Sequence, residues 1–182
     1  MSLGRRHLLR SRADDSGYVP CPPAFLRHLR EVCDKHGIAL ILDEVQTGFF
    51  RTGTYFASEH TPGLRPDIMI FAKGIANGFP LSGIVTTKAI SSTLDSGSLG
   101  GTYAGNAVSC AAGVAAQDVF ASEDIAGNVA ARSKQLYKAL NDLAESPKFK
   151  HLFAEVRGVG VSWCGLAGLA LAWSGLALTK HD

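Results

Sequence analysis

The sequence predicts an α/β domain with a mainly parallel β-sheet and flanking helices. Two short, continuous apolar runs, 38–42 and 68–71, have the length and character of strands that are buried on both faces. They alternate with segments of helical periodicity, an arrangement typical of parallel sheets. The 182 residues include 46% apolar and 19% charged side chains, which is enough for a folded core and excludes a disordered chain.

The first helix is expected to begin at Pro22-Pro23 and to end at Gly37, which occupies the position of a C-terminal cap. Its apolar positions recur at helical spacing: Phe25, Leu26, Leu29, Val32 and Cys33. Further along the chain, an Ala-rich helix is predicted over 106–120 and an amphipathic helix over 124–143. A loop of small residues, 97–105, precedes them.

Charged residues follow the two strongest strand predictions. The run 38–42 ends at Asp43-Glu44, and the run 68–71 is followed by Lys73. A third strand is predicted over 84–87. Ligands of open α/β sheets bind at the carboxyl ends of the strands, so Asp43 and Lys73 are expected at a ligand-binding edge.

An acid and a lysine at such an edge can serve a specific chemistry. In a partly desolvated pocket a lysine amine loses its proton more easily and forms an imine with an aldehyde. A buried carboxylate needs a cationic partner, which a protonated pyridine nitrogen can provide. Asp43 and Lys73 therefore suit pyridoxal phosphate (PLP) chemistry. From these two residues alone, an ordinary ion pair at the sheet edge remains the favoured alternative.

Three motifs in order strengthen the PLP interpretation. They are LDEVQTGF at 42–49 with Arg51-Thr52-Gly53, PDI with AKG and NGFPLSG within 66–83, and GGTYAGN at 100–106. These motifs resemble those of class III (subgroup II) aminotransferases, PLP enzymes of fold type I. The resemblance covers about 17–160 and is closest to the 4-aminobutyrate aminotransferase branch. It implies that the chain is a fragment of the large domain of that fold.

The resemblance implies a role for each candidate site residue. Lys73 would form the internal aldimine with PLP and later move a proton between the substrate carbon and the cofactor. Asp43 would pair with the pyridinium nitrogen, so that the ring can accept electrons. Val45 would pack on a ring face, and Gln46 would lie near the phenolic oxygen. Thr102 would donate a hydrogen bond to the phosphate in the neighbouring subunit, which implies a homodimer.

Structural roles remain open for these side chains. Val45 could belong to the core, Gln46 could cap a turn, and the Thr102 hydroxyl could bind its own backbone. Arg51 is expected to be structural rather than substrate-binding. Phe50 stands where the resembling family usually has Gly or Ala, and its bulk could be tolerated or could block the cofactor mouth.

The two ends of the chain differ from the middle. The segment 1–16 is rich in Arg and Ser and is expected to be disordered, with an organellar transit peptide as the alternative. Four of the 18 basic residues, Arg5, Arg6, Arg10 and Arg12, lie in it, so the net charge of +2 does not indicate a nucleic-acid partner. No charged residue occurs from 158 to 179, a length that could cross a bilayer. Glycines dilute that stretch and argue against a membrane span, which leaves a tail-anchored protein as a distant alternative.

The four cysteines, Cys21, Cys33, Cys110 and Cys164, form no C-x-x-C pair and have no His at metal-ligand spacing. Neither a zinc site nor a redox motif is predicted, and reduced thiols are expected. This agrees with a cytoplasmic or mitochondrial protein, between which the sequence does not decide.

The activity implied is transfer of an amino group from an ω-amino acid, such as 4-aminobutyrate, to a 2-oxo acid through pyridoxamine phosphate. We divide the chain into a divergent head, 1–16, a partial PLP-transferase large domain, 17–160, and an uncharged tail, 161–182. The family resembled has a chain more than twice as long, with a phosphate loop and a carboxylate-binding arginine that are not recognised here. The alternative is therefore a truncated, non-catalytic remnant with weak or no PLP binding, and the chain is expected to be inactive alone.

Overall fold

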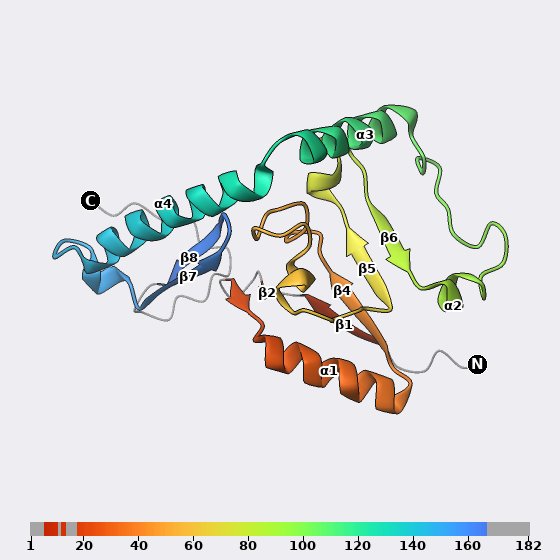
Figure 1. Cartoon of the computed structure of the whole chain (residues 1–182), viewed down its shortest axis with the longest axis horizontal. Helices are drawn as coiled ribbons and strands as arrows, with labels where there is room; N and C mark the ends of the chain where they lie inside the picture. The colour runs from red at the N-terminus through yellow and green to blue at the C-terminus, as the bar shows by residue number, and fades with distance from the viewer. Residues whose placement is uncertain (1–5, 11, 14–17, 167–182) are drawn as a thin grey trace, which may run out of the picture.

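The computed structural model describes residues 6–10, 12–13 and 18–166 (Figure 1). Its strands are β1 (Arg6–Arg10), β2 (Arg12–Ala13), β3 (Val19–Pro20), β4 (Ala39–Asp43), β5 (Ile68–Phe71), β6 (Gly83–Thr86), β7 (Glu155–Val159) and β8 (Ser162–Leu166). Its α-helices are α1 (Pro23–His36), α2 (Lys88–Ser91), α3 (Ala107–Ser122) and α4 (Ile125–Glu145). Short 3₁₀ helices are η2 (Ala57–His60), η3 (Lys73–Ile75) and η4 (Lys150–Leu152).

A four-stranded sheet with the order β1-β4-β5-β6 forms the centre of the structure. β1, β4 and β5 run parallel, and β6 is antiparallel to β5. The predicted α/β class with a mainly parallel sheet is therefore confirmed. The predicted strands are found within one residue of their expected bounds.

Strand β1 lies in the head, for which we expect no ordered structure from the sequence. The structure differs at Arg6–Arg10, which pair with β4 from Arg6 opposite Ala39 to Arg10 opposite Asp43. A sheet edge offers unpaired N–H and C=O groups that any extended backbone can satisfy. Such pairing uses backbone groups and requires no pattern of apolar side chains, so the sequence does not predict this strand.

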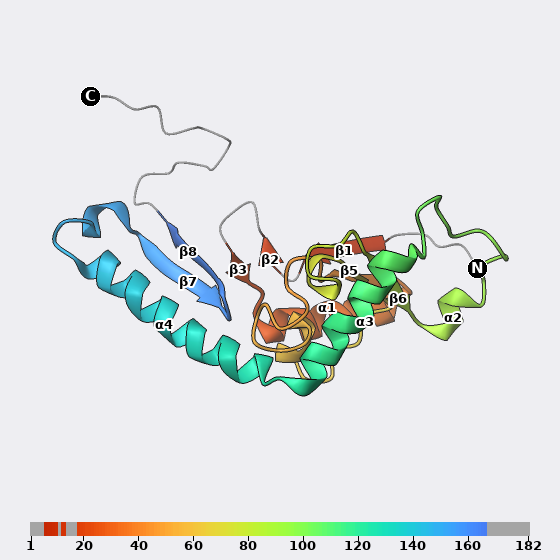
Figure 2. The same cartoon turned by 90° about the horizontal axis from the view of Figure 1, so that it is seen from above.

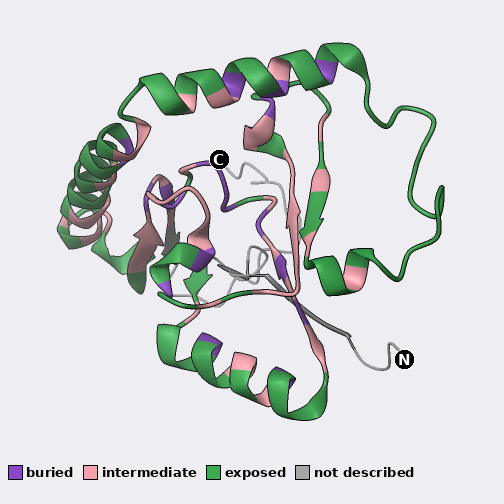
Figure 3. Ribbon diagram, turned by 45° about the vertical axis from the view of Figure 1, so that its right-hand side comes forward, coloured by how far each residue is buried: buried purple, intermediate pink, exposed green. Residues whose placement is uncertain are grey.

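Helix α1 packs against β4 and closes a small core. Cys33, Leu40 and Leu42 are fully buried there, with Leu29, Ile38 and Leu64 packed around them. Gly37 has a φ of 62° and its N–H reaches the Asp34 carbonyl at the end of α1, as expected for the predicted cap. Burial decreases across the sheet from β4 to β6 (Figure 3). All residues of β5 are half-buried, and Val85 of β6 is 58% exposed. The prediction that the strands are buried on both faces was therefore wrong for β5, and in β4 only the alternate residues Leu40 and Leu42 are buried.

The two long helices follow the sheet and are capped by side chains. The Asn106 side chain accepts hydrogen bonds from the Val108 and Ser109 N–H groups, each at 3.1 Å, and begins α3. α4 packs against the antiparallel β7–β8 hairpin, and both views show them side by side (Figures 1 and 2). The Tyr137 and Trp163 rings lie 5.2 Å apart across this contact. The two predicted helices are thus present with slightly longer bounds.

The uncharged tail lies largely outside the described residues, since only its first part belongs to β8. The membrane-span alternative rests mainly on 167–182 and so lies outside them as well. In the part of the chain that is described, no helix is long and apolar enough to cross a membrane.

Candidate active site

The sheet presents Asp43 and Lys73 at one edge. Asp43 is the last residue of β4 and stands opposite Ile70 of β5. Lys73 follows β5 directly and opens η3. Because β4 and β5 are parallel, both residues lie at the carboxyl ends of neighbouring strands, as the sequence predicts.

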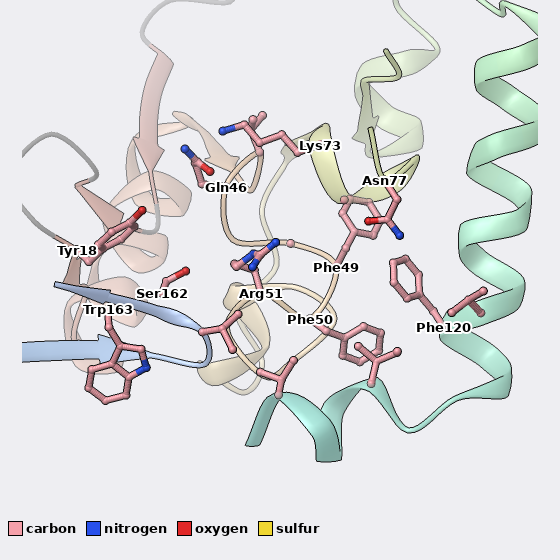
Figure 4. Close-up of a pocket in the computed structure, with 17 residues that line it drawn as sticks. Tyr18, Gln46, Phe49, Phe50, Arg51, Lys73, Asn77, Phe120, Ser162 and Trp163 are labelled. Atoms are coloured by element: carbon pink, nitrogen blue, oxygen red, sulfur yellow. The ribbon is translucent and has the colours of Figure 1, made fainter. Parts of the chain in front are cut away.

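A pocket of about 490 Å³ lies beside this edge and collects three of the predicted site residues: Val45, Gln46 and Lys73. The loop after β4, the junction of α3 and α4, and the tip of the β7–β8 hairpin form its walls. Figure 4 shows the Lys73 side chain extending toward the side of Gln46. The volume lies within the range of small-molecule sites, so the pocket is large enough for a cofactor of the size of PLP.

The other two predicted site residues do not line this pocket. Asp43 stays at the strand end, where its Oδ1 accepts a hydrogen bond from the Val45 N–H at 3.0 Å. Thr102 is exposed on the loop before α3. The structure of this single chain thus brings Lys73, Val45 and Gln46 to one pocket. Asp43 contacts the backbone of Val45 at the end of β4, and Thr102 is not among the residues that line the pocket.

Unusual backbone geometry concentrates in the same pocket. Among the described residues, the non-glycine residues with positive φ are Tyr18, Phe49, Phe50, Lys73 and Asn77, with φ between 39° and 65°. All of them line the pocket. Side chains other than Gly adopt this conformation at a cost of roughly 1 kcal/mol or more, and such strain accumulates at functional sites. This concentration marks the pocket independently of the sequence motifs.

A buried carboxylate that the sequence analysis did not single out holds the loop after β4. Glu44 is fully buried and accepts hydrogen bonds from the Ala57 N–H at 3.1 Å, the Ser58 N–H at 2.8 Å and the Thr47 hydroxyl. These contacts join the loop that carries Val45 and Gln46 to the start of η2. An acid directly after an apolar strand is the available sequence signal, but its partners lie elsewhere in the chain.

Phe50 lines the pocket and belongs to an aromatic cluster in its wall. It packs against Tyr55 at 5.3 Å and Phe120 at 5.6 Å between ring centroids, both in edge-on geometry. Phe49 contacts the same two rings and also Phe71 of β5. Figure 4 shows Phe49, Phe50 and Phe120 gathered on the side of the pocket away from Gln46.

Tyr55 ties this cluster to α3. Its hydroxyl donates a hydrogen bond to the Gln117 side-chain oxygen, and burial raises the pKa of Tyr55 above its usual value. The Gln117 bond lowers the pKa in part, but desolvation dominates. Tyr55 is therefore a neutral donor, and the loop after β4 is fixed to the helix that borders the pocket.

The model of the aminotransferase class-III family matches residues 13–165. The chain belongs to the class-III aminotransferase family. The match extends slightly beyond both ends of the 17–160 segment drawn from the motifs. It confirms the family predicted from the sequence.

Individual relatives agree with this assignment. The chain is 42% identical over 146 residues to 5-aminovalerate aminotransferase from Pseudomonas putida. That alignment covers 80% of this chain and 33% of the relative. The chain is 43% identical over 148 residues to 4-aminobutyrate aminotransferase from Escherichia coli, with 80% and 33% covered. This chain spans about a third of the length of these relatives.

A solved structure supports both the fold and the family's cofactor. Taurine:2-oxoglutarate aminotransferase from Bifidobacterium kashiwanohense, in complex with PLP and glutamate, aligns with a TM-score of 0.78 and 34% identity. The alignment covers 87% of this chain and 35% of that one. PLP as the cofactor of the family is thus confirmed, whereas the named amino donors of the relatives differ.

Proposed function

We propose that this chain provides part of a PLP-dependent aminotransferase site that moves an amino group from an ω-amino acid to a 2-oxo acid. The observation that carries the proposal is Lys73, held in left-handed geometry in a small-molecule pocket beside the strand end that bears Asp43. Membership of the class-III aminotransferase family supports it.

The proposed roles follow from the position of each side chain. When bound, PLP supplies an aldehyde and a ring that accepts electrons. Lys73 Nζ would be the attachment point, and its free amine would move a proton to and from the substrate carbon. The Asp43 carboxylate would hold the ring nitrogen, and the Gln46 amide would bind the phenolic oxygen. Val45 would pack against the ring.

The pocket walls suit an unbranched ω-amino acid. Phe49, Val119, Ile125 and Val129 provide apolar surface, on which a methylene chain can pack without losing hydrogen bonds. The names of the two curated relatives specify 5-aminovalerate and 4-aminobutyrate, which each join a primary amine to a carboxylate through such a chain. We therefore propose donors of this class.

We further propose that Thr102 acts in a homodimer, by binding the cofactor phosphate of the neighbouring subunit. Its exposure on a loop that makes no part of its own pocket supports this assignment. In an isolated monomer, the cofactor phosphate would lack the hydrogen bond from the neighbouring subunit's threonine. We accordingly expect the isolated monomer to react with PLP at Lys73 but to show little or no amino-group transfer.

The test is covalent attachment. The purified chain is mixed with PLP, its visible absorbance is recorded, the adduct is reduced with borohydride, and the modified lysine is located by peptide mass spectrometry. We expect one modified site at Lys73, absent in Lys73→Ala and retained in the matched control Lys88→Ala, which changes an exposed lysine of α2. Equal labelling of Lys73 and Lys88 would contradict a specific site.

An amino-transfer assay completes the test. 4-Aminobutyrate and 2-oxoglutarate are supplied at increasing chain concentration, and glutamate is measured. Activity that appears only at concentrations where dimers form supports the shared site, whereas labelling at Lys73 without transfer at any concentration identifies the non-catalytic alternative.

A further inference from the structure

Glu44 connects the strand that leads to Lys73 with the loop that carries Val45 and Gln46. Its N–H donates a hydrogen bond to the Ile70 carbonyl of β5 at 2.8 Å. Lys73 follows three residues after Ile70, just beyond the end of this strand. The backbone of Glu44 is therefore fixed to the same strand from which Lys73 enters the pocket.

The Glu44 carbonyl closes the turn at the start of this loop. It accepts hydrogen bonds from the Gly48 N–H at 2.9 Å and from the Thr47 N–H at 3.3 Å. A Cβ on Gly48 would stand only 3.1 Å from the Glu44 carbonyl oxygen, so the turn is closely packed around this atom. Val45 and Gln46, which line the pocket, lie between the two ends of the turn. Their position therefore follows from that of Glu44.

The Glu44 carboxylate binds a segment that lies outside the pocket. Besides the Thr47 hydroxyl, its donors are the Ala57 N–H at 3.1 Å and the Ser58 N–H at 2.8 Å, at the start of η2. No residue of η2 is among those that line the pocket. One side chain thus joins the pocket wall to a short helix that does not itself reach the pocket.

The charge of this buried carboxylate makes the junction rigid. Within the part of the chain that the structure describes, no Lys, Arg or His forms an ion pair with Glu44, so hydrogen-bond donors alone satisfy it. Hydrogen bonds to a charged acceptor are stronger than those between neutral groups, and a buried charge that loses its donors is strongly unfavourable. A displacement of η2 would therefore carry the loop with it or leave the charge without a donor.

We infer that Glu44 is a positioning residue, which places Val45 and Gln46 relative to Lys73 and makes the shape of the pocket depend on η2. Figure 4 shows the Gln46 side chain on the same side of the pocket as Lys73. The inference rests on the proposed function, because that function assigns these three side chains to the cofactor. A carboxylate with a merely structural role would stabilise the fold without a specific effect on the pocket.

The first experiment measures amide hydrogen exchange in the full chain without cofactor. In Glu44→Gln, whichever way the new amide is turned, its NH₂ group faces the N–H of Ala57 or of Ser58. We expect about tenfold faster exchange at 45–50, expressed relative to β4 so that a general loss of stability cancels. The matched control is Leu26→Ala, which removes a buried side chain of α1 and should leave this ratio unchanged.

A second variant acts from the far side of the junction. Ala57→Pro removes the N–H that binds Glu44, at the first position of η2, where helices accept proline. Phe56 before it is extended, with φ of −124° and ψ of 146°, as proline requires of the preceding residue. We expect about threefold faster exchange in the loop, since one of three donors is lost. Lys88→Pro, at the first position of α2 and also after an extended residue, is the matched control and should have no effect on the loop.

PLP affinity, followed by visible absorbance, completes the test, and circular dichroism verifies that each variant is folded. We expect Glu44→Gln to bind PLP about tenfold more weakly, whereas Leu26→Ala and Lys88→Pro keep the native affinity. Native exchange of the loop in both Glu44→Gln and Ala57→Pro would overturn the inference. So would an equal loss of PLP affinity in Glu44→Gln and Leu26→Ala, since that outcome indicates a general loss of stability. A native chain that fails to bind PLP would count against the proposed function alone, because hydrogen exchange tests the loop without cofactor.

Discussion

The edge that bears Lys73 and the loop that bears Thr102 are built in opposite ways, although both are proposed to serve one cofactor. Around Lys73, a buried carboxylate, an aromatic cluster and several left-handed residues fix the backbone. The segment 91–106 is exposed at every residue, with Tyr103 at 88%, and its backbone hydrogen bonds are local turns. The residues around Lys73 are therefore held by packing within the chain, whereas those of the segment that bears Thr102 are exposed.

The strongest way to break this contrast is to remove the acid behind the edge. We expect Glu44→Ala to lower the free energy of unfolding by about 3 kcal/mol, because buried N–H and O–H donors lose their acceptor. Urea denaturation measures the change, with the exposed Glu31→Ala as control. A loss below about 1 kcal/mol would show that water replaces the carboxylate and that the edge is less firmly held than described.

A pair of matched glycine substitutions sharpens the contrast. A Cβ on Gly74 would stand 2.8 Å from the Phe49 Cβ, whereas one on Gly101 would meet nothing within 4 Å. We expect Gly74→Ala to destabilise by roughly 2 kcal/mol through overpacking and to slow the reaction of the adjacent Lys73 with PLP. Gly101→Ala should stay within about 0.5 kcal/mol of the native chain. Thermal unfolding of the two variants side by side decides this, and similar losses would contradict the difference between the two regions.

Two thiols next to these regions differ in the same way, with a smaller effect: Cys33 of α1 packs beneath β4, and Cys110 of α3 follows the Thr102 loop. Burial raises the pKa of Cys33, which is 1% exposed beneath the sheet, whereas Cys110 of α3 is exposed. The folded state keeps the Cys33 thiol protonated, so stability falls as pH rises above the unfolded pKa of about 8.5 and the unfolded chain ionises.

We expect Cys33→Ala to lose this part of the pH dependence between pH 8 and 10. In native buffer, Ellman's reagent should modify Cys110 quickly and Cys33 slowly. If Cys33 reacted as fast as Cys110, the packing of α1 on β4 would be looser than the structure shows.

The smallest expected effect belongs to Thr102. Thr102→Ala should change the free energy of unfolding by less than about 0.5 kcal/mol, because the side chain is exposed. It should weaken retention of PLP only at protein concentrations where dimers form, which equilibrium dialysis at two concentrations can show. An equal loss in the monomer would place Thr102 in its own subunit's site and remove the distinction between the two regions.

Local patterns sufficed for much of this fold. The helix cap at Gly37, the apolar runs of β4 and β5 and the order of the motifs all express short-range rules, and the structure agrees with them. Strand β1 is not predicted from the sequence, because backbone pairing with an exposed edge needs no side-chain pattern. The exposure of β6 is not predicted either, since an apolar run does not say whether anything covers it.

The site was predictable only in part for the same reason. Val45 and Gln46 follow from one motif and Lys73 from another, and the structure brings all three to one pocket. Two hydrogen-bond donors to Glu44 lie 13 and 14 positions away in η2. The Arg51 carbonyl accepts a hydrogen bond from the N–H of Val161, at the tip of the distant β7–β8 hairpin. Such contacts depend on tertiary packing, so the spacing of residues within a local segment does not predict them.

The left-handed residues around the pocket have a consequence for the speed and cost of binding. Hydrogen bonds and ring contacts within the chain fix their geometry, so the entropy of ordering these loops is lost when the protein folds. A molecule that enters the pocket meets walls that folding has already ordered. Replacement of one of these residues by glycine would relax the backbone, raise the entropy lost on binding, and be expected to show itself as a faster release of the ligand rather than a slower capture.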